Sequence, residues 1–227
     1  MARLAPTSRD EVADMVRDAR GLGARLRICG GDTRRRSGRA DGHAATLDIS
    51  GLDRIIAYEP DELVLTAEPG VRLETVRALL ATRGQHLAFE PAARAAASTL
   101  GGVIGANIAG PRRLSAGTVR DHFLGFEAVN GRGVVFRAGG RVVKNVTGFD
   151  LPKLLAGAWG SLAVLTQVTV KVMPAPATVL TLALESSNGG GLDDARGLAA
   201  LGTACGTAAE VTGAAQLPGL TLLRLEG

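Results

Sequence analysis

A short polar turn follows the first predicted strand, and it is the first place where the chain could hold a ligand. The segment RICGGDT, residues 27–33, is a strand end that breaks into two glycines and two small polar side chains. Because glycine has no Cβ, successive backbone N–H groups there can converge on an anion such as a pyrophosphate. Taken alone, a glycine pair after a strand more often marks an ordinary tight turn.

A second glycine-rich segment, residues 98–107, combines a helix cap with a glycine pair. Ser98 and Thr99 can cap a helix, and Gly101 and Gly102 follow in its first turn. A helix N-terminus presents free N–H groups and the positive end of its dipole to a phosphate. The alternative is close helix packing through small residues, although each glycine costs about 1 kcal/mol in a helix. The residues alone leave both interpretations open.

Other common site motifs are missing from the sequence. Gly21-Leu22-Gly23 precedes a predicted strand and is not completed to G-x-G-x-x-G, and no G-x-x-x-x-G-K-[ST] occurs. The three histidines are widely separated and give neither a zinc spacing nor a nucleophile triad. The two cysteines match no metal-ligand spacing and no disulfide framework, as is typical of a reducing compartment. We predict no metal site and can name no catalytic base.

Composition limits the classes of protein. With 227 residues, 46% of them hydrophobic, the chain is long enough for one large domain or one and a half. No apolar run approaches a membrane span, and the N-terminus lacks a signal-peptide pattern, so we expect a cytoplasmic protein without a transmembrane segment. Aromatics at 3% leave little material for stacking bases, which argues against a nucleic-acid partner.

The hydrophobic pattern predicts the elements that must position the two glycine segments. A helix is expected over 8–19, another over 73–80, one entered at 98–102, and a short one from Asp150. Strands are expected at 26–29, 45–49, 55–58, 63–67, 126–129, 134–137, 141–143 and 162–173, with a hairpin at 55–67. The mixture predicts an α+β protein.

Beyond Pro176 the pattern predicts the opening of a second α+β unit. It consists of a strand at 178–184, a helix at 192–204 and a strand at 220–225. Because the chain stops directly after this last apolar strand, which has no predicted partner, we expect a fragment or a truncated product. The predicted domains are 1–175, with subdomains of about 1–57 and 58–175, and a partial substrate or cap domain at 176–227.

The order of these segments resembles the vanillyl-alcohol-oxidase/para-cresol-methylhydroxylase type of FAD-binding family. The likeness covers roughly residues 25 to 174. It is strongest in the closing block, residues 139–150 and 160–174. It is carried by GGDT at 30–33, Glu90-Pro91, TLGG at 99–102 with Asn107, VRD at 119–121, LGFE at 124–127 and that closing block.

The resemblance implies a two-part FAD-binding domain followed by a cap domain. Backbone at 29–33 and 99–102 would hold the pyrophosphate, the isoalloxazine would lie over the second glycine segment, and Val164 would present backbone to the adenine. Covalently flavinylated members carry His where this chain has Asp32, so FAD should be noncovalent. The implied cofactor-binding residues are Cys29, Gly30, Gly31, Asp32, Thr33, Pro91, Thr99, Leu100, Gly101, Gly102, Asn107, Arg120, Asp121 and Val164.

Within that family, segments 109–113, 117–121 and 143–150 are most similar to the FAD-binding subunit of bacterial glycolate oxidases. This likeness implies an FAD-dependent oxidoreductase that converts a small 2-hydroxy acid, glycolate, to glyoxylate. It also implies a second flavin subunit and an iron–sulfur subunit as partners, and contact with the inner membrane only through that complex.

Two other functions stay open. The chain could belong to a self-sufficient FAD-dependent oxidase or dehydrogenase of another small alcohol or hydroxy acid. Alternatively, a non-catalytic scaffold could dock a partner or nucleic acid through Arg34, Arg35, Arg36 and Arg39, although such charge runs are usually solvated loops. Of the remaining candidates, Trp159 is predicted to be a core residue. Lys144 and Asn145 are assigned equally to a cofactor contact or a structural role.

Overall fold

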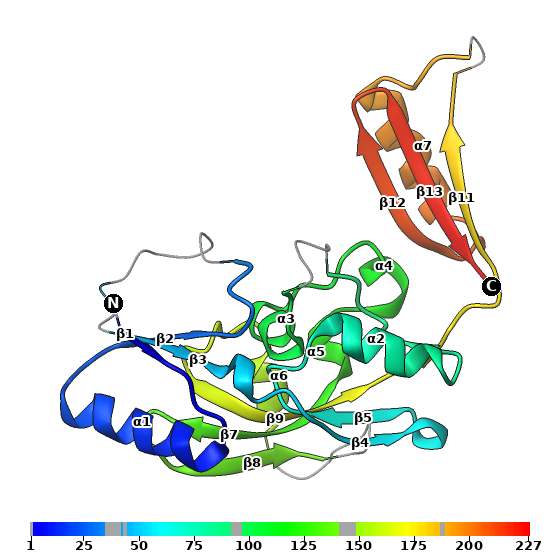
Figure 1. Ribbon diagram of the computed structural model, residues 1–227. Coiled ribbons are helices and arrows are strands. Elements are labelled where there is room, and N and C mark those ends of the chain that lie inside the picture. Colours follow the sequence, from blue (N-terminus) through cyan, green and yellow to red (C-terminus); the bar gives the residue numbers. More distant parts are fainter. Residues whose placement is uncertain (1, 35–41, 43–44, 92–96, 141–148, 187–188) are drawn as a thin grey trace.

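The computed structural model describes residues 2–34, 42, 45–91, 97–140, 149–186 and 189–227 (Figure 1). Within these ranges the chain forms an α+β fold with four sheets, which confirms the predicted class. The predicted strand at 141–143, together with Lys144 and Asn145, lies outside the described residues. No helix of the described chain is long and apolar enough to cross a bilayer.

The N-terminal elements form a small parallel sheet that leads into the first glycine turn. The sheet has the order β1 (Ala2–Leu4), β3 (Ala45–Asp48), β2 (Leu26–Cys29). Helix α1 (Arg9–Gly21) begins where the Ser8 hydroxyl accepts a hydrogen bond from the Glu11 amide, at 3.3 Å. The buried face of α1 packs on Leu47 of β3. The first predicted helix and both predicted strands are therefore confirmed.

A five-stranded antiparallel sheet forms the centre of the molecule. Its order is β4 (Ile55–Glu59), β5 (Val64–Ala67), β9 (Ala163–Lys171), β7 (Phe123–Asn130), β8 (Val135–Gly139). Strands β7 and β9 are buried along nearly their whole length. Helices pack above the sheet in Figure 1, and α1 of the N-terminal part packs on β7 and β9. The predicted hairpin at 55–67 is confirmed.

Short helices cover this sheet and carry the second glycine segment. They are α2 (Leu73–Ala81), α3 (Leu100–Ala106), α4 (Arg113–Ala116), α5 (Val119–His122) and α6 (Leu151–Leu155). A two-stranded pair, β6 (Gln85–His86) with β10 (Met173–Pro174), and the 3-10 turns Ile49–Gly51 and Pro60–Glu62 complete this part. The largest apolar cluster joins α2 and α3 to β7 and β9, so α3 is held on the core.

The C-terminal residues form a separate three-stranded sheet that projects from one side of the molecule in Figure 1 and contacts the rest through β12 and α4. Its order is β11 (Val179–Leu184), β13 (Leu220–Glu226), β12 (Val211–Leu217), with α7 (Asp194–Cys205) packed on β12 and β13. The prediction that the last strand lacks a partner is wrong, because β13 is the middle strand. Strand β12 escaped prediction because its central Gly and Ala residues, which are depleted in strands, give a weak strand pattern. The predicted domain boundaries stay a prediction.

An ion-pair network joins the C-terminal sheet to the loop after β6. The Arg224 guanidinium donates to both Glu90 carboxylate oxygens, at 2.9 and 2.7 Å. Arg112 donates to Glu226 at 2.6 Å, and Arg224 Nε lies 3.1 Å from the same Glu226 oxygen. Two arginines and two glutamates therefore balance one another while largely shielded from water, and removing any one would leave a poorly solvated charge.

His86 is the neutral neighbour of this network. Its Nδ1 lies 2.8 Å from Nη1 of Arg112. The pKa of His86 is lowered to about 4, mainly by burial and next by the positive charge of Arg112. Glu90 acts in the opposite direction, and Arg224 and His122 make smaller lowering contributions. Folded His86 is therefore uncharged at neutral pH.

We predict that His86 makes the protein acid-sensitive. The unfolded side chain takes up a proton near pH 6.5, whereas the folded one stays neutral down to about pH 4, so the free energy of unfolding falls as pH drops through this window. Between about pH 7.5 and about pH 5 this loss is at most about 2 kcal/mol. Urea unfolding at both pH values should show the wild type losing that much more than His86→Gln. Equal losses would contradict the assignment.

Candidate functional site

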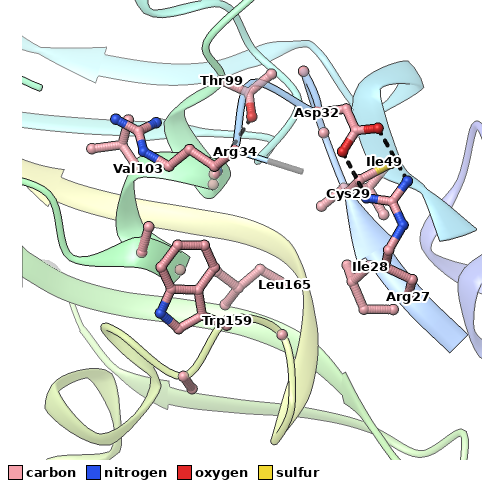
Figure 2. A pocket seen from close by; sticks show the side chains of 18 of the residues that line it. Arg27, Ile28, Cys29, Asp32, Arg34, Ile49, Thr99, Val103, Trp159 and Leu165 are labelled. Atoms are coloured by element: carbon pink, nitrogen blue, oxygen red, sulfur yellow. Dashed lines mark hydrogen bonds and ion pairs between the residues drawn. The ribbon is translucent and has the colours of Figure 1, made fainter. Parts of the chain in front are cut away.

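A cavity of about 360 Å³ lies between the two glycine segments, and three stretches of the chain together with Ile49 line it. The first runs from β2 through the turn to Arg34, the second is the start and inner face of α3, and the third is the α6–β9 connection, residues 155–165. Figure 2 shows Thr99 and Val103 of the second stretch facing Ile28 and Cys29 of the first across the cavity, with Trp159 and Leu165 below. Residues remote in sequence thus share one hollow.

The first glycine turn, residues 29–33, is better suited to bind an anion than the second glycine segment is. The amides of residues 30–33 donate no main-chain hydrogen bond to another described residue. Asp32 has a left-handed backbone, φ 50°, of the kind that turns successive N–H groups toward one side of a loop. This geometry supports the interpretation of residues 29–33 as a phosphate-binding turn.

The two glycine segments also pack directly on each other. A Cβ on Gly31 would lie 1.5 Å from the carbonyl oxygen of Ala97, and one on Gly30 would lie 2.5 Å from Thr99 Oγ1. Glycine is therefore required at both positions by the neighbouring chain, and at Gly31 the obstacle is backbone. These contacts fix the width of the cavity at its glycine end.

The amides of the second glycine segment are already occupied, which corrects the sequence-based interpretation. The Leu100 and Gly101 amides donate to Val71 O and Pro69 O, at 2.9 and 2.7 Å. The Gly102 amide donates to the Thr99 side chain at 3.2 Å, which makes Thr99 the N-cap of α3. Sequence alone cannot reveal this because the acceptors lie in a distant loop. Gly101 and Gly102 line the cavity, and they contribute a close backbone wall more than free donors.

Charge in the cavity lining is arranged around one ion pair. Arg27 donates to both oxygens of Asp32, at 2.6 and 3.1 Å, and each side chain is about a quarter exposed (Figure 2). Arg34 also lines the cavity, so two arginines and one aspartate give the described lining a net charge of +1. Burial raises the pKa of the Cys29 thiol, with a further contribution from the charge of Asp48. The site is thus suited to an anionic ligand.

Trp159 belongs to the cavity wall, so the prediction that it is a core residue is wrong. Its side chain is 51% exposed and lines the cavity, while its amide donates to Gly105 O at 2.9 Å. The hydrophobic character of tryptophan suggested burial, but the left-handed backbone at φ 54° turns the side chain outward. Glycines on both sides, Gly157 and Gly160, were the signal that could have indicated a turn here.

Eight of the fourteen predicted cofactor-binding residues line this cavity. They are Cys29, Gly30, Gly31, Asp32, Thr33, Thr99, Gly101 and Gly102. Sequence reasoning missed Ser98 as a lining residue; its hydroxyl is buried and has no hydrogen-bond partner among the described residues. A buried hydroxyl without a partner on the wall of a cavity is a candidate contact for a polar ligand atom.

The other six predicted residues lie elsewhere. Leu100 is buried in the apolar core, and Pro91 is buried beyond the cavity. Asn107 accepts a hydrogen bond from the Arg120 amide at 3.1 Å, and the Asp121 carboxylate caps α5 by accepting from the Thr118 amide at 2.7 Å. These roles are structural in the described chain. Val164 borders a second cavity of about 350 Å³, which shares Leu26, Ile28, Gly160, Ser161 and Ala163 with the first.

The chain matches the family model of an FAD binding domain over residues 2–139, more than half of its length, and it belongs to that family. The family resemblance inferred from sequence is confirmed, and FAD is the cofactor that goes with it. The site fits this group, because it combines an amide-lined turn, a net positive lining and a cavity with apolar walls.

Similar proteins add detail. Glycolate oxidase subunit GlcE of Escherichia coli is 44% identical over 142 residues, 63% of this chain and 41% of that protein. Glycolate oxidase subunit GlcD of Bacillus subtilis is 32% identical over 191 residues, 80% of this chain and 38% of that protein. D-lactate dehydrogenase of Archaeoglobus fulgidus is 34% identical over 129 residues, 57% of this chain and 29% of that protein. The chain spans about two fifths or less of the length of these curated relatives.

Solved structures confirm the fold. A structure of alkyldihydroxyacetonephosphate synthase superposes with a TM-score of 0.78, covering 99% of this chain and 47% of that one. The sequences are 16% identical, so the likeness concerns the fold alone. It extends over the C-terminal sheet as well as the FAD-binding part.

We predict that the contact between the glycine segments is required for folding. Gly31→Ala would force Cβ into the Ala97 carbonyl and should lower the free energy of unfolding by about 3 kcal/mol. Gly105→Ala is the matched control, because a Cβ there meets nothing within 4 Å and alanine favours the helix. Thermal and urea unfolding would measure both. Equal stability of the two variants would show that the close approach at Gly31 is unimportant.

Proposed function

We propose that this chain is the FAD-binding part of a 2-hydroxy-acid oxidoreductase, with glycolate as the substrate. The observation that supports it most is the shared cavity, in which the free amide turn at 30–33 faces the backbone of Gly101 and Gly102. The substrate class rests on similarity, because relatives from three organisms are named for glycolate or D-lactate, both 2-hydroxy acids. The chain spans about two fifths or less of the length of these relatives, so the activity of the whole enzyme is part of the proposal.

Within this proposal, the chain binds and orients the cofactor. FAD, when bound, supplies the redox chemistry by taking up two electrons from the hydroxy acid. The amides of 30–33 and the charge of Arg34 would hold the diphosphate, and the Ser98 hydroxyl would contact it or the adjoining sugar alcohol. Apolar side chains of α3 and β9, including Val103 and Leu165, would exclude water from the flat rings.

The proposal includes noncovalent attachment of FAD. Asp32 stands where the resemblance places the linking histidine of other members, and its carboxylate is held by Arg27. The Cys29 thiol is buried, and its raised pKa keeps it protonated and weakly nucleophilic at neutral pH. Acid precipitation of the yellow protein should therefore release all flavin into the supernatant. Flavin retained in the pellet would contradict noncovalent binding.

A multisubunit complex is the favoured setting, because both glycolate oxidase relatives are named as subunits. We propose a second flavin subunit and an iron–sulfur subunit as partners. The test is glycolate-dependent dye reduction by the full-length protein alone and after co-expression with candidate partner subunits. Activity only in the complex supports the proposal. Activity of the single chain would favour a self-sufficient hydroxy-acid dehydrogenase.

We predict that Gly102→Val weakens FAD binding at least about tenfold. A Cβ at Gly102 approaches only Thr99 Oγ1, at 3.0 Å, so the added methyl groups would project into the cavity and crowd the cofactor. Flavin absorbance after gel filtration and calorimetric titration of the apoprotein would measure the change. Gly202→Val in α7 is the control, since a Cβ on that glycine meets nothing within 4 Å and the residue borders neither cavity. Unchanged affinity of Gly102→Val would show that the site is misplaced.

A further inference from the structure

We propose that Trp159 is an aromatic stacking residue for bound FAD, on which one of the flat rings of the cofactor rests. This inference depends on the proposed FAD site and adds a contact that neither the sequence motifs nor the family match assigns.

The backbone at Trp159 is held in a conformation that bulky residues avoid. Its φ of 54° is left-handed, and for a side chain with a Cβ this costs about 1 kcal/mol or more. Flanking contacts enforce it: the Gly157 and Trp159 amides donate to Ile104 O and Gly105 O of α3, at 3.1 and 2.9 Å. Gly160 follows, also left-handed at φ 72° and packed on Ile28. The loop is thus clamped between α3 and β2 with tryptophan at its outward position.

The indole gains little from this arrangement by itself. It stays 51% exposed, although tryptophan is among the side chains with most to gain from burial. It lines the cavity beside Gly105, where a Cβ would meet nothing within 4 Å, so open space borders the ring. In Figure 2 the ring stands below Arg34 and beside Leu165. A strained, exposed aromatic ring facing an open cavity is explained by a ligand that covers it.

A flat heteroaromatic ring is the ligand surface that fits. An indole face offers stacking to adenine or to isoalloxazine, and such contacts strengthen binding by about five- to fiftyfold per ring. Both rings belong to FAD, and the loop lies between the two cavities, since Gly160 and Ser161 border both. The stacking contact is therefore with either the adenine or the isoalloxazine ring, and affinities for FAD and ADP distinguish the two.

The test compares FAD and ADP affinities of the apoprotein for the wild type, Trp159→Ala, Trp159→Leu and Trp159→Phe. We expect Ala and Leu to weaken FAD binding about five- to fiftyfold, and Phe to stay within about threefold of wild type. If adenine is the stacked ring, ADP affinity falls by the same factor. If isoalloxazine is, ADP affinity is unchanged while FAD affinity falls. Phe149→Ala is the control, because it removes an exposed aromatic ring that borders neither cavity.

Several results separate this proposal from the function on which it rests. Trp159 is the sole tryptophan of the chain, so its fluorescence reports directly on the ring, and thermal unfolding of each apo variant shows whether folding has changed. Wild-type FAD affinity in Trp159→Ala would overturn stacking and leave the FAD site standing. A Phe variant as weak as the Leu variant would also overturn it, because bulk alone would then be the requirement. Failure of the wild type to bind FAD would overturn the proposed function itself.

Discussion

The close approach of two backbone segments, at Gly31 and Ala97, is the constraint on which the candidate site depends. No side chain can stand between them, because a Cβ on Gly31 would overlap the Ala97 carbonyl. This contact joins the small parallel sheet to α3 and hence to the central antiparallel sheet, on which α3 is packed. The cavity lies beside this contact, and residues 30–33, whose amides make no main-chain hydrogen bond to another described residue, line it.

The two glycine segments differ in whether their amides are already hydrogen-bonded. The amides at the start of α3 are satisfied by Val71, Pro69 and Thr99, which fixes the helix in place and makes it a rigid wall. The amides of 30–33 have no such partners among the described residues and can serve an anion. One segment is therefore positioned by the fold, and the other is left for the ligand. Asp32 does not oppose an anion strongly, because Arg27 neutralises it.

Most of the fold around the site could be predicted from the sequence, because its signals are local. The Ser8 cap, the strand at 26–29 that ends in two glycines, and the Thr99 cap all act within a few residues of themselves. The family resemblance supplied the cofactor, which no spacing in the chain defines. What could not be predicted depends on distant contacts. Strand β12 pairs with β13, and the α3 amides are occupied by acceptors in another loop. Asn107 accepts from the Arg120 amide, and Asp121 accepts from Thr118.

The C-terminal sheet shows how charge can fix the relation between two parts of a chain. Its β13 carries Arg224 and Glu226, and each finds an opposite partner in Glu90 and Arg112 of the FAD-binding part. Salt bridges at exposed surfaces contribute little to the free energy of unfolding, but these four side chains are mostly shielded from water. A different orientation of the C-terminal sheet would leave them as unpaired, poorly solvated charges. We expect these ion pairs to determine the orientation of the C-terminal sheet more than to increase the stability of the protein. Glu90 precedes Pro91 in a segment that the family resemblance marks, so a stretch singled out by that resemblance holds the C-terminal sheet in place through Arg224.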